Sequence, residues 1–507
     1  MRCVAFALAL AALAMCASAG PLYDYVHAPD DDYTYEVMNQ TIKGVDFTVY
    51  NVFLTSGEWM PQYSNKPMWT HWLQVCVPHK PRKDNDIALL YIDGGHTANK
   101  ASPPSKGDAL VEILCGTTGA VSAHLSAVPS EPLVFSNDPS GKSRTEDAII
   151  AWTWKVWLES GGKADPTWLL RFPMVRSVLR AMDTIETFTA SYGKDLVPVR
   201  RWLLAGASKR GWTTWMAAAT AATAERPDRV VAAVPIVAPV GDLVFMIGDM
   251  YKAYNGFSFA LDDYLDAGVI DYLNLPLFQS LLDLVTPTGP GFAANYSRQT
   301  ILSIDATGDE FFMPEPWRAK TGSWVKPIED AGATVIQRMV PNAEHSLTGH
   351  QIDVALTVQS FAVAIMEGKT IPVMSTSISV SDKLATIDVH IDPASSTNSQ
   401  PKKCIGWHGY NKHTRDFRLI TCADFKNPAC LNPILWFDEP LVPMGNNSWT
   451  FSRAVPEAGY EGLFIECEFD FAGLSWLDPL KLTSFVSVAP TAFPFKPCPP
   501  TVCASGK

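Results

Sequence analysis

Hydrophobic and polar positions follow two patterns along the chain, and the change between them falls at about residue 371. Before this point, short apolar runs typical of buried strands alternate with segments of helical periodicity. Strands are predicted at 86–92, 120–128, 202–205, 230–238, 300–306 and 334–340, after strand-like segments at 33–37, 46–54 and 68–77. Helices are predicted at 146–160, 174–192, 212–222 and 350–368. This alternation indicates an α/β domain with a mainly parallel sheet covered by helices.

The alternation is interrupted between residues 241 and 298, where the sequence is aromatic and helix-prone. This insertion is predicted to be a helical lid over the C-terminal edge of the sheet, with additional core packing as the alternative. After residue 370, apolar and polar residues alternate with period two, which indicates a small β-sandwich-like domain. The predicted domains are therefore an α/β domain at 20–370 with its lid at 241–298, a disulfide-stapled β domain at 371–490, and a Pro- and Cys-containing tail at 491–507.

The first 19 residues have the pattern of a secretory signal peptide, with one basic residue, a short apolar stretch and a small-x-small ending before Gly20. The apolar stretch is too short for an ordinary membrane anchor. We therefore predict a secreted, extracellular protein without membrane insertion. Removal of 1–19 takes away Arg2, so 39 of the 40 basic residues remain against 52 acidic residues, a net charge of −13. This charge makes nucleic acid an unexpected partner.

Eight of the ten cysteines follow the predicted signal peptide, and an even number suits an oxidising compartment. Two are in the first part of the chain and six in the last quarter, so separate bridging within each part is the simplest hypothesis, although the sequence leaves the connectivity open. The disulfide candidates are Cys76, Cys115, Cys404, Cys422, Cys430, Cys467, Cys498 and Cys503. Three glycosylation sequons, at Asn39, Asn295 and Asn446, agree with secretion.

A tight turn is required between the strand at 202–205 and the helix at 212–222, and it contains the sequence Gly-Ala-Ser-Lys-Arg-Gly. A serine on such a turn is held in an exposed, strained position beside a helix N-terminus, which is the arrangement of a nucleophile elbow. Ser208 is therefore the predicted nucleophile, and a serine that only caps a buried helix is the alternative. The turn departs from the G-x-S-x-G pattern because Arg210 replaces the second glycine, which follows one position later.

A glycine pair follows the strand at 86–92, in the sequence Asp-Gly-Gly-His-Thr at 93–97. Backbone N–H groups exposed by such a pair can stabilise an oxyanion. The predicted oxyanion donors are the backbone N–H groups of Gly95 and Lys209. A plain turn at the end of a strand is the alternative interpretation of the pair.

A serine nucleophile needs a general base and a carboxylate that orients the base. Asp309 follows the strand at 300–306 and His345 follows the strand at 334–340. The order Ser208, Asp309, His345 is the one found in α/β-hydrolases. These three residues are the predicted catalytic triad.

Each member of the acid and base pair has a rival nearby. Asp305 is expected within its strand, Glu310 one step beyond the turn, and His350 in the following helix, so all three are weaker candidates. The sequence contains no H-E-x-x-H or comparable metal spacing and no phosphate-binding glycine loop, so neither a metal nor a cofactor is predicted.

Removal of short N-terminal peptide segments would require carboxylates that bind the free α-ammonium of the substrate. Glu146 and Asp147 are the most conspicuous acidic pair, and Asp93 before the glycine pair is another candidate. However, Glu146 is expected to complete a capping box with Ser143, and Asp147 to complement the helix dipole, so neither residue is assigned to the site.

Five motifs in the chain resemble one family, the PhoPQ-activated pathogenicity-related proteins: Arg144–Trp154, Phe172–Met174 with Arg180–Asp183, Gly206–Trp212, Asp305–Phe312 and Arg415–Arg418. The resemblance implies an α/β-hydrolase core followed by a C-terminal β domain. It also implies, through an amoebal member that resembles dipeptidyl peptidases, an extracellular repressor of proliferation. The chain has His96 where bacterial members tend to have a small polar residue.

The function predicted from these observations is a secreted, cofactor-independent serine hydrolase that cleaves peptides in the manner of a dipeptidyl peptidase and represses proliferation outside the cell. A carbohydrate esterase of the glucuronoyl type is one alternative, because those enzymes also carry a basic residue directly after the elbow serine, as Lys209 does here. A secreted signalling ligand that uses the hydrolase scaffold to bind a cell-surface receptor is the other.

Overall fold

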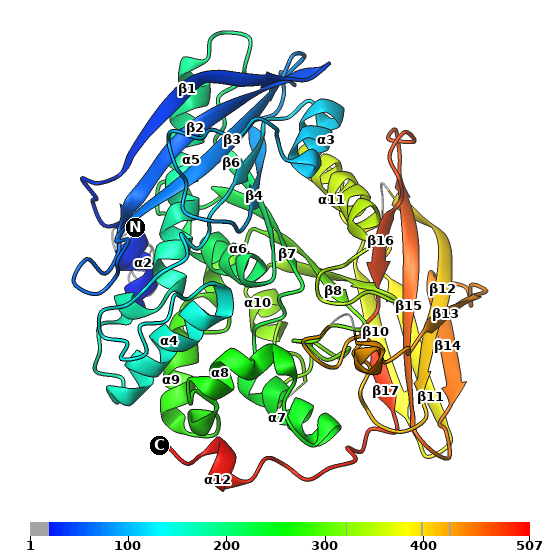
Figure 1. Cartoon of the computed structure of the whole chain (residues 1–507). Coiled ribbons are helices and arrows are strands. Elements are labelled where there is room, and N and C mark those ends of the chain that lie inside the picture. Colours follow the sequence, from blue (N-terminus) through cyan, green and yellow to red (C-terminus); the bar gives the residue numbers. More distant parts are fainter. Residues whose placement is uncertain (1–19, 321, 397–398, 425–426, 507) are drawn as a thin grey trace, which may run out of the picture. The chain divides into compact units, whose positions relative to one another are not determined.

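The computed structural model describes residues 20–320, 322–396, 399–424 and 427–506 (Figure 1). The predicted signal peptide at 1–19 lies outside them. The chain divides into two compact units. The first comprises residues up to Pro235, Asp266–Thr300 and Pro327–Ala333, and the second comprises Ile236–Leu265, Ile301–Lys326 and the chain from Thr334 onward. None of the described helices is long and apolar enough to span a bilayer.

Nine strands form the main sheet, in the order β1-β2-β3-β5-β4-β6-β7-β8-β9. Their bounds are Thr34–Lys43, Phe47–Glu58, Met68–Pro78, Ile87–Ile92 (β4), Ser122–Leu125 (β5), Arg201–Ala207, Val230–Ile236, Thr300–Ala306 and Thr334–Val340. The first three strands pair antiparallel and β3 pairs antiparallel with β5, whereas β4 pairs in parallel with both β5 and β6. The predicted α/β class with a mixed, mostly parallel sheet is therefore confirmed.

The pattern of buried residues agrees with the position of each strand in the sheet. In β4, every residue except Tyr91 is buried, as expected for a strand with neighbours in the sheet and elements on both faces. In β1, most residues are exposed, and this strand occupies the edge of the sheet. The order of the strands in the sheet departs from their order in the sequence at one place, where β5 lies between β3 and β4 and β4 lies beside β6.

The helices of the first unit are α2 (Gly20–His27), which precedes β1, then α3 (Ala109–Thr118), α4 (Glu146–Glu159), α5 (Arg171–Ser191), α6 (Lys209–Thr220), α9 (Pro276–Val285) and α10 (Lys326–Asp330), with short 3-10 turns at Pro166–Trp168, Ile270–Tyr272 and Ala293–Tyr296. Helix α6 packs against both β6 and α5. The disulfide between Cys76 and Cys115 links β3 to α3 inside an apolar cluster with Val49 and Val111. The predicted helix at 212–222 in fact begins three residues earlier, at Lys209.

The second unit contains α7 (Leu243–Tyr254), α8 (Asp262–Asp266), α11 (Gln351–Met366) and two antiparallel sheets, with 3-10 turns at Phe259–Leu261 and Pro428–Cys430. The three-stranded sheet has the order β10-β11-β14, and the five-stranded sheet the order β13-β12-β15-β16 with β17 on β15. Their bounds are Met374–Val380, Leu384–Ile391, Ser399–Asn411, Trp436–Pro440, Ser448–Ala454, Tyr460–Phe471, Leu480–Thr483 and Ser487–Ala489 for β10 to β17. Period-two alternation thus correctly predicted antiparallel strands after residue 371.

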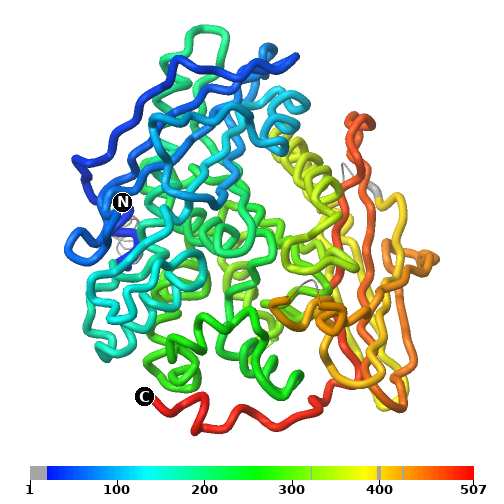
Figure 2. Tube along the Cα trace, viewed as in Figure 1, coloured from blue at the N-terminus to red at the C-terminus, as the bar shows by residue number. Residues whose placement is uncertain are grey.

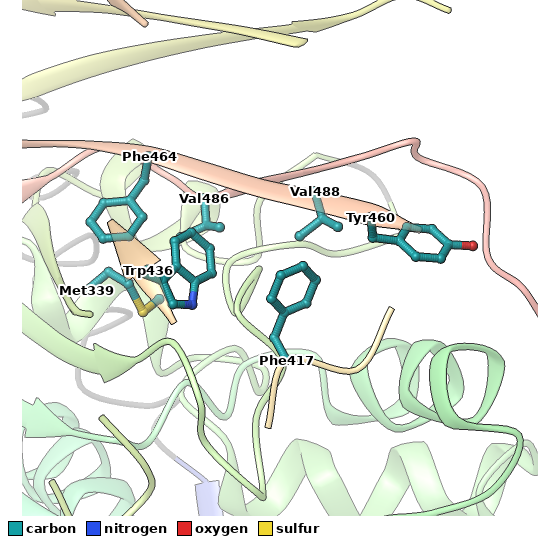
Figure 3. Close-up of a cluster of buried hydrophobic side chains, with 7 residues drawn as sticks. All are labelled: Met339, Phe417, Trp436, Tyr460, Phe464, Val486 and Val488. Carbon is teal, nitrogen blue, oxygen red and sulfur yellow. The ribbon is translucent and has the colours of Figure 1, made fainter. Parts of the chain in front are cut away.

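Large side chains close the core under the five-stranded sheet (Figure 3). Phe464 and Val488, on adjoining strands, point toward Trp436 and Phe417, and each of these four side chains is buried. Three disulfides reinforce this unit, joining Cys404 to Cys467, Cys422 to Cys430, and Cys498 to Cys503. Each of the four disulfides therefore joins two cysteines from the same part of the chain. This agrees with the simplest hypothesis from the sequence.

The tail beyond β17 runs as an extended segment to α12 (Pro500–Cys503), drawn in red in Figure 2. The backbone N–H of Phe495 donates a hydrogen bond of 3.1 Å to the carbonyl of Lys252 in α7. The tail, which belongs to the second unit, is therefore attached to α7 of the same unit. The insertion at 241–298 is helical, as expected from its sequence, and its role as a lid stays a prediction, as do the domain limits at 370 and 490.

Candidate active site

Ser208 lies at the turn between β6 and α6, with φ 57° and ψ −127°. A non-glycine residue rarely adopts this backbone conformation, and residues held in it concentrate at functional sites. The turn needs Gly206, because a Cβ there would lie 2.8 Å from the carbonyl oxygen of Arg210. The local geometry is thus that of the predicted elbow, with the serine directly before the first residue of the helix.

Arg210, which replaces the second glycine of the usual pattern, ties the elbow to two other segments. Its Nε donates a 2.6 Å hydrogen bond to the carbonyl of Val128, and its Nη2 donates one of 2.7 Å to Glu146. Its side chain is only 10% exposed. A Cβ at Gly94 would collide with this guanidinium, so a glycine at this position after β4 is also required for its placement. Arg210 therefore fixes the elbow helix against the loop that contains Gly95.

Lys209 forms a second link from the elbow to α4. Its Nζ lies 2.9 Å from both Glu146 Oε2 and Asp147 Oδ2, and its side chain is 9% exposed. Although burial acts in the opposite direction, Asp147 and Glu146 raise the pKa of Lys209. Lys209 and Arg210 thus pair with the carboxylates of Glu146 and Asp147.

The capping box predicted for Glu146 is wrong. Thr145, not Ser143, precedes the helix and makes no side-chain capping bond, and Glu146 itself has φ 53°. Its carboxylate binds Arg210 and Lys209 instead, so electrostatic pairing next to the elbow outweighs local capping. Against the effect of burial, these two cations lower the pKa of Glu146 to about 2.

Glu131 completes the acidic side of this cluster. Its Oε2 accepts a 2.7 Å hydrogen bond from the backbone N–H of Glu146. Burial, together with the nearby carboxylate of Glu146, raises the pKa of Glu131 to about 7. The backbone of Glu146 is thus held in its uncommon conformation by a side chain from another segment.

Gly95 has φ 108° in the loop after β4, a conformation that favours glycine. Hydrogen bonds from the backbone of Ala127 to Gly94 and of Val128 to Asp93, of 2.7 and 3.0 Å, fix this loop. Asp93 also lies 3.1 Å from His124 Nε2, and this contact lowers the pKa of Asp93 against the effect of burial. Both predicted oxyanion donors therefore belong to well-braced backbone of the first unit, and their role stays a prediction.

In the second unit, His345 and Asp309 come together as predicted. The Nδ1 atom of His345 lies 2.8 Å from Asp309 Oδ2, and the aspartate side chain is 2% exposed. The other carboxylate oxygen accepts backbone hydrogen bonds from Phe311 and Phe312, of 2.7 and 3.1 Å. The Phe311 ring lies 4.5 Å from the imidazole. Asp309 thus holds the imidazole through Nδ1, the arrangement that a general base requires.

The two acidic rivals of Asp309 have other contacts. Glu310 accepts a 3.0 Å hydrogen bond from the backbone N–H of His345, and burial with the nearby Asp309 raises the pKa of Glu310 to about 7. Asp305 lies in β8, as expected, and binds Ser303; burial raises the pKa of Asp305 to about 8. His350 is the residue directly before α11. Of these carboxylates, Asp309 is the one hydrogen-bonded to the His345 ring.

Another serine and histidine pair, which sequence reasoning missed, lies on β2 and β3. Ser56 Oγ is 2.8 Å from His71 Nε2, and both residues are buried. His71 Nδ1 is bound to the carbonyl of Ser126 rather than to a carboxylate, and burial lowers the pKa of His71 to about 4. Such a pair lacks the orienting acid of a triad, which makes Ser56 the weaker nucleophile candidate.

The predicted site residues are thus distributed over both units. Ser208, Lys209 and Gly95 belong to the first, and Asp309 and His345 to the second. The complete triad stays a prediction. Of the three sequons, Asn39 and Asn446 are exposed and Asn295 is half-buried, and their modification likewise stays a prediction.

Comparison with known proteins identifies the class of this chain. Residues 22–418 match the family described as PhoPQ-activated pathogenicity-related protein. The autocrine proliferation repressor protein A of Dictyostelium discoideum is 36% identical over 488 residues, which cover 94% of this chain and 92% of that protein. The chain belongs to the PhoPQ-activated pathogenicity-related family, as its motifs indicated.

Solved structures of esterases are distant structural neighbours. An acetyl xylan esterase from Thermoanaerobacterium is 13% identical and covers 67% of this chain and 90% of its own, with a TM-score of 0.40. A glucuronoyl esterase from Solibacter usitatus is 15% identical and covers 66% of this chain and 87% of its own, with a TM-score of 0.38.

Proposed function

We propose that this protein is a secreted serine hydrolase in which Ser208 is the nucleophile, His345 the general base and acid, and Asp309 the residue that orients His345. The observation that carries the proposal is the backbone of Ser208, which has φ 57° between a buried strand and the start of a helix. Such strain persists only where the surrounding structure enforces it. Here Gly206, Arg210 and the ion cluster of α4 enforce it.

The chemistry follows from these roles. Ser208 Oγ attacks the acyl carbon while His345 Nε2 accepts its proton, and the backbone N–H groups of Lys209 and Gly95 stabilise the oxyanion. His345 then returns the proton to the leaving group, and water hydrolyses the acyl-enzyme by the same steps. Asp309 stabilises the imidazolium through Nδ1, for which its geometry is suited. No cofactor is needed.

The charge balance beside the elbow favours an ester or an N-terminally blocked peptide over a peptide with a free N-terminus. Recognition of an α-ammonium would need a carboxylate that lacks a cation, but Glu146 and Asp147 are already bound by Lys209 and Arg210. The same pairing occupies the ammonium of Lys209, which therefore is not free to bind an acidic sugar. The acidic pair of α4 and the lysine next to Ser208 therefore offer neither of the two finer specificities a charged group that is free to bind substrate.

A fluorophosphonate probe tests the nucleophile, since it labels activated serines. Wild type should be labelled and Ser208→Ala should not, whereas Ser56→Ala should be labelled as wild type is. If labelling persists in Ser208→Ala and is lost in Ser56→Ala, the nucleophile is Ser56 and not Ser208. Labelling of neither wild type nor any variant would refute the hydrolase proposal.

Substrate class is tested by comparing short-chain esters with dipeptide amides, each amide in free and N-acetylated form. We expect esters and acetylated amides to be hydrolysed at least as fast as free amides. A strong preference for free dipeptide amides would instead support the dipeptidyl-peptidase activity. The substrate ammonium would then bind to residues other than Glu146 and Asp147.

An extracellular signal is the second candidate function, supported by the 36% identity to a protein named as an autocrine proliferation repressor. Secretion is part of this candidate and is supported by the signal-peptide pattern and the four disulfides. Purified wild type and Ser208→Ala should be added to cells of the source organism. Equal growth inhibition would make catalysis dispensable for signalling through a surface receptor, and no response to either protein would exclude the signal.

A further inference from the structure

A cavity of about 420 Å³ lies within the second unit. It is lined by the loop after β8, by β10, by the segment around β17 and by Arg415, which begins a family motif that the proposed catalysis does not use. Neither Asp309 nor His345 is among its lining residues. The cavity therefore needs an explanation separate from the hydrolase reaction, and its volume falls in the range of small-molecule sites.

Most of the cavity wall is apolar. Trp317 and Phe485 form an aromatic side, with their ring centroids 6.0 Å apart. Ile378 and Val380 form an aliphatic side, and because they are two residues apart on β10 they point to the same face of the strand. Ile378 is 41% exposed despite being apolar. An apolar body would bury this surface.

A buried arginine is among the residues that line the cavity. Arg415 is 1% exposed and donates to Glu315 through Nη2, but its Nε and Nη1 have no hydrogen-bond partner among the described residues. Ser323 Oγ and Trp317 Nε1, from the same lining, are buried and equally unpaired within the described chain. Buried donors without acceptors are costly, so several at one cavity point to an absent acceptor.

The charged side chains near Arg415 do not balance. Three cations surround the ring of Phe493 from the tail, with Lys252, Arg318 and Arg415 at 4.4, 5.6 and 4.6 Å from its centroid. Two carboxylates pair with them, namely Asp249 and Glu315. Three cations minus two carboxylates leave one positive charge. Burial also lowers the pKa of Arg415, because desolvation disfavours the charged guanidinium.

We propose that this cavity binds a small molecule that carries a carboxylate on an apolar body, with the carboxylate at Arg415 and the body between Trp317, Phe485 and β10. A carboxylate would supply acceptors for the unpaired guanidinium N–H groups and would neutralise the surplus charge. An uncharged apolar molecule would do neither. The inference does not depend on the proposed hydrolase activity.

Isothermal titration calorimetry of the full Ser208→Ala protein with three ten-carbon probes tests the inference. These probes are decanoate, decanol and decyltrimethylammonium, each used below its aggregation concentration. We expect decanoate to bind at least tenfold more tightly than the other two. Equal binding of decanoate and decanol would remove the anion site, and failure of decanoate to bind would overturn the inference.

A substitution that fills the cavity with a larger side chain tests whether decanoate binds there. Ile378→Trp should weaken decanoate binding at least tenfold, whereas Leu384→Trp, at a 47% exposed position outside the lining, should leave it unchanged. Unaltered affinity in Ile378→Trp would place decanoate elsewhere and refute the site. A decanoate analogue with a terminal diazirine gives an independent readout, because it should crosslink wild type within 311–326, 374–380 or 485–491. Crosslinks confined to other segments would also refute it.

Discussion

Replacement of Arg210 tests whether this residue braces the elbow. Arg210→Met keeps the length and apolar packing of the side chain but removes both hydrogen bonds, the one to the carbonyl of Val128 and the one to Glu146. The Val128 carbonyl would lose a donor in a buried position, and Glu146 would keep Lys209 as its cation. The elbow helix would then lose its hydrogen bonds to Val128, whose backbone N–H holds the carbonyl of Asp93, and to α4.

The expected loss of stability can be worked out from these two bonds. Hydrogen bonds to charged groups contribute about 1.5–3 kcal/mol each. The bond to Val128 belongs at the upper end because both groups are buried, and the bond to Glu146 at the lower end because that side chain is 37% exposed. The free energy of unfolding should therefore fall by about 4.5 kcal/mol.

Urea unfolding followed by tryptophan fluorescence measures this change, as the midpoint shift at constant m-value. Arg201→Met is the matched control, because Arg201 forms an ion pair with Asp86 but its side chain is 40% exposed. Its loss should cost less than about 1 kcal/mol. Arg210→Met should also lower kcat for an ester about 10²–10³-fold if the loop supplies an oxyanion donor. Equal stability losses in the two variants would refute the bracing role of Arg210.

Three further outcomes are expected. Gly94→Ala should destabilise the protein by about 1–3 kcal/mol in urea unfolding, because the new Cβ displaces Arg210, whereas Gly248→Ala, in a helix with no neighbouring atom within 4 Å, should be neutral or stabilising. The pKa of Asp305 is raised to about 8, so between pH 5 and pH 8 the folded protein holds a proton that the unfolded chain releases. Wild type should therefore lose more stability over this range than Asp305→Asn does. Equal pH profiles of the two proteins in urea unfolding would contradict this. Intact mass of the secreted protein should lack residues 1–19, and retention of this segment would contradict the signal peptide.

Much of the fold could be predicted from the sequence because its strands are apolar runs that local patterns identify. The runs at 86–92 and 202–205 became β4 and β6, and the change to period two after residue 371 became the antiparallel sheets. The pairing of His345 with Asp309 was also predictable, since both follow consecutive strands of the sheet and the carboxyl ends of such strands meet at one edge.

What the sequence could not reveal were contacts that depend on distant segments. Glu146 and Ser143 satisfy the local pattern of a capping box, yet Glu146 binds Lys209 and Arg210 from a helix more than 60 positions away. Local patterns contain no information on these cations. The cavity at Arg415 was hidden for the same reason, because its lining comes from four separate stretches of the chain.

Two of the family motifs are therefore complementary parts of one ion cluster. The motif that begins at Arg144 supplies Glu146 and Asp147, and the motif that begins at Gly206 supplies Lys209 and Arg210. A glycine at 210, as in the usual elbow pattern, would leave the Val128 carbonyl without this donor and the two carboxylates with a single cation. The arginine in the elbow and the acidic start of α4 thus require each other, and the departure from G-x-S-x-G is explained by charge pairing rather than by a weaker elbow.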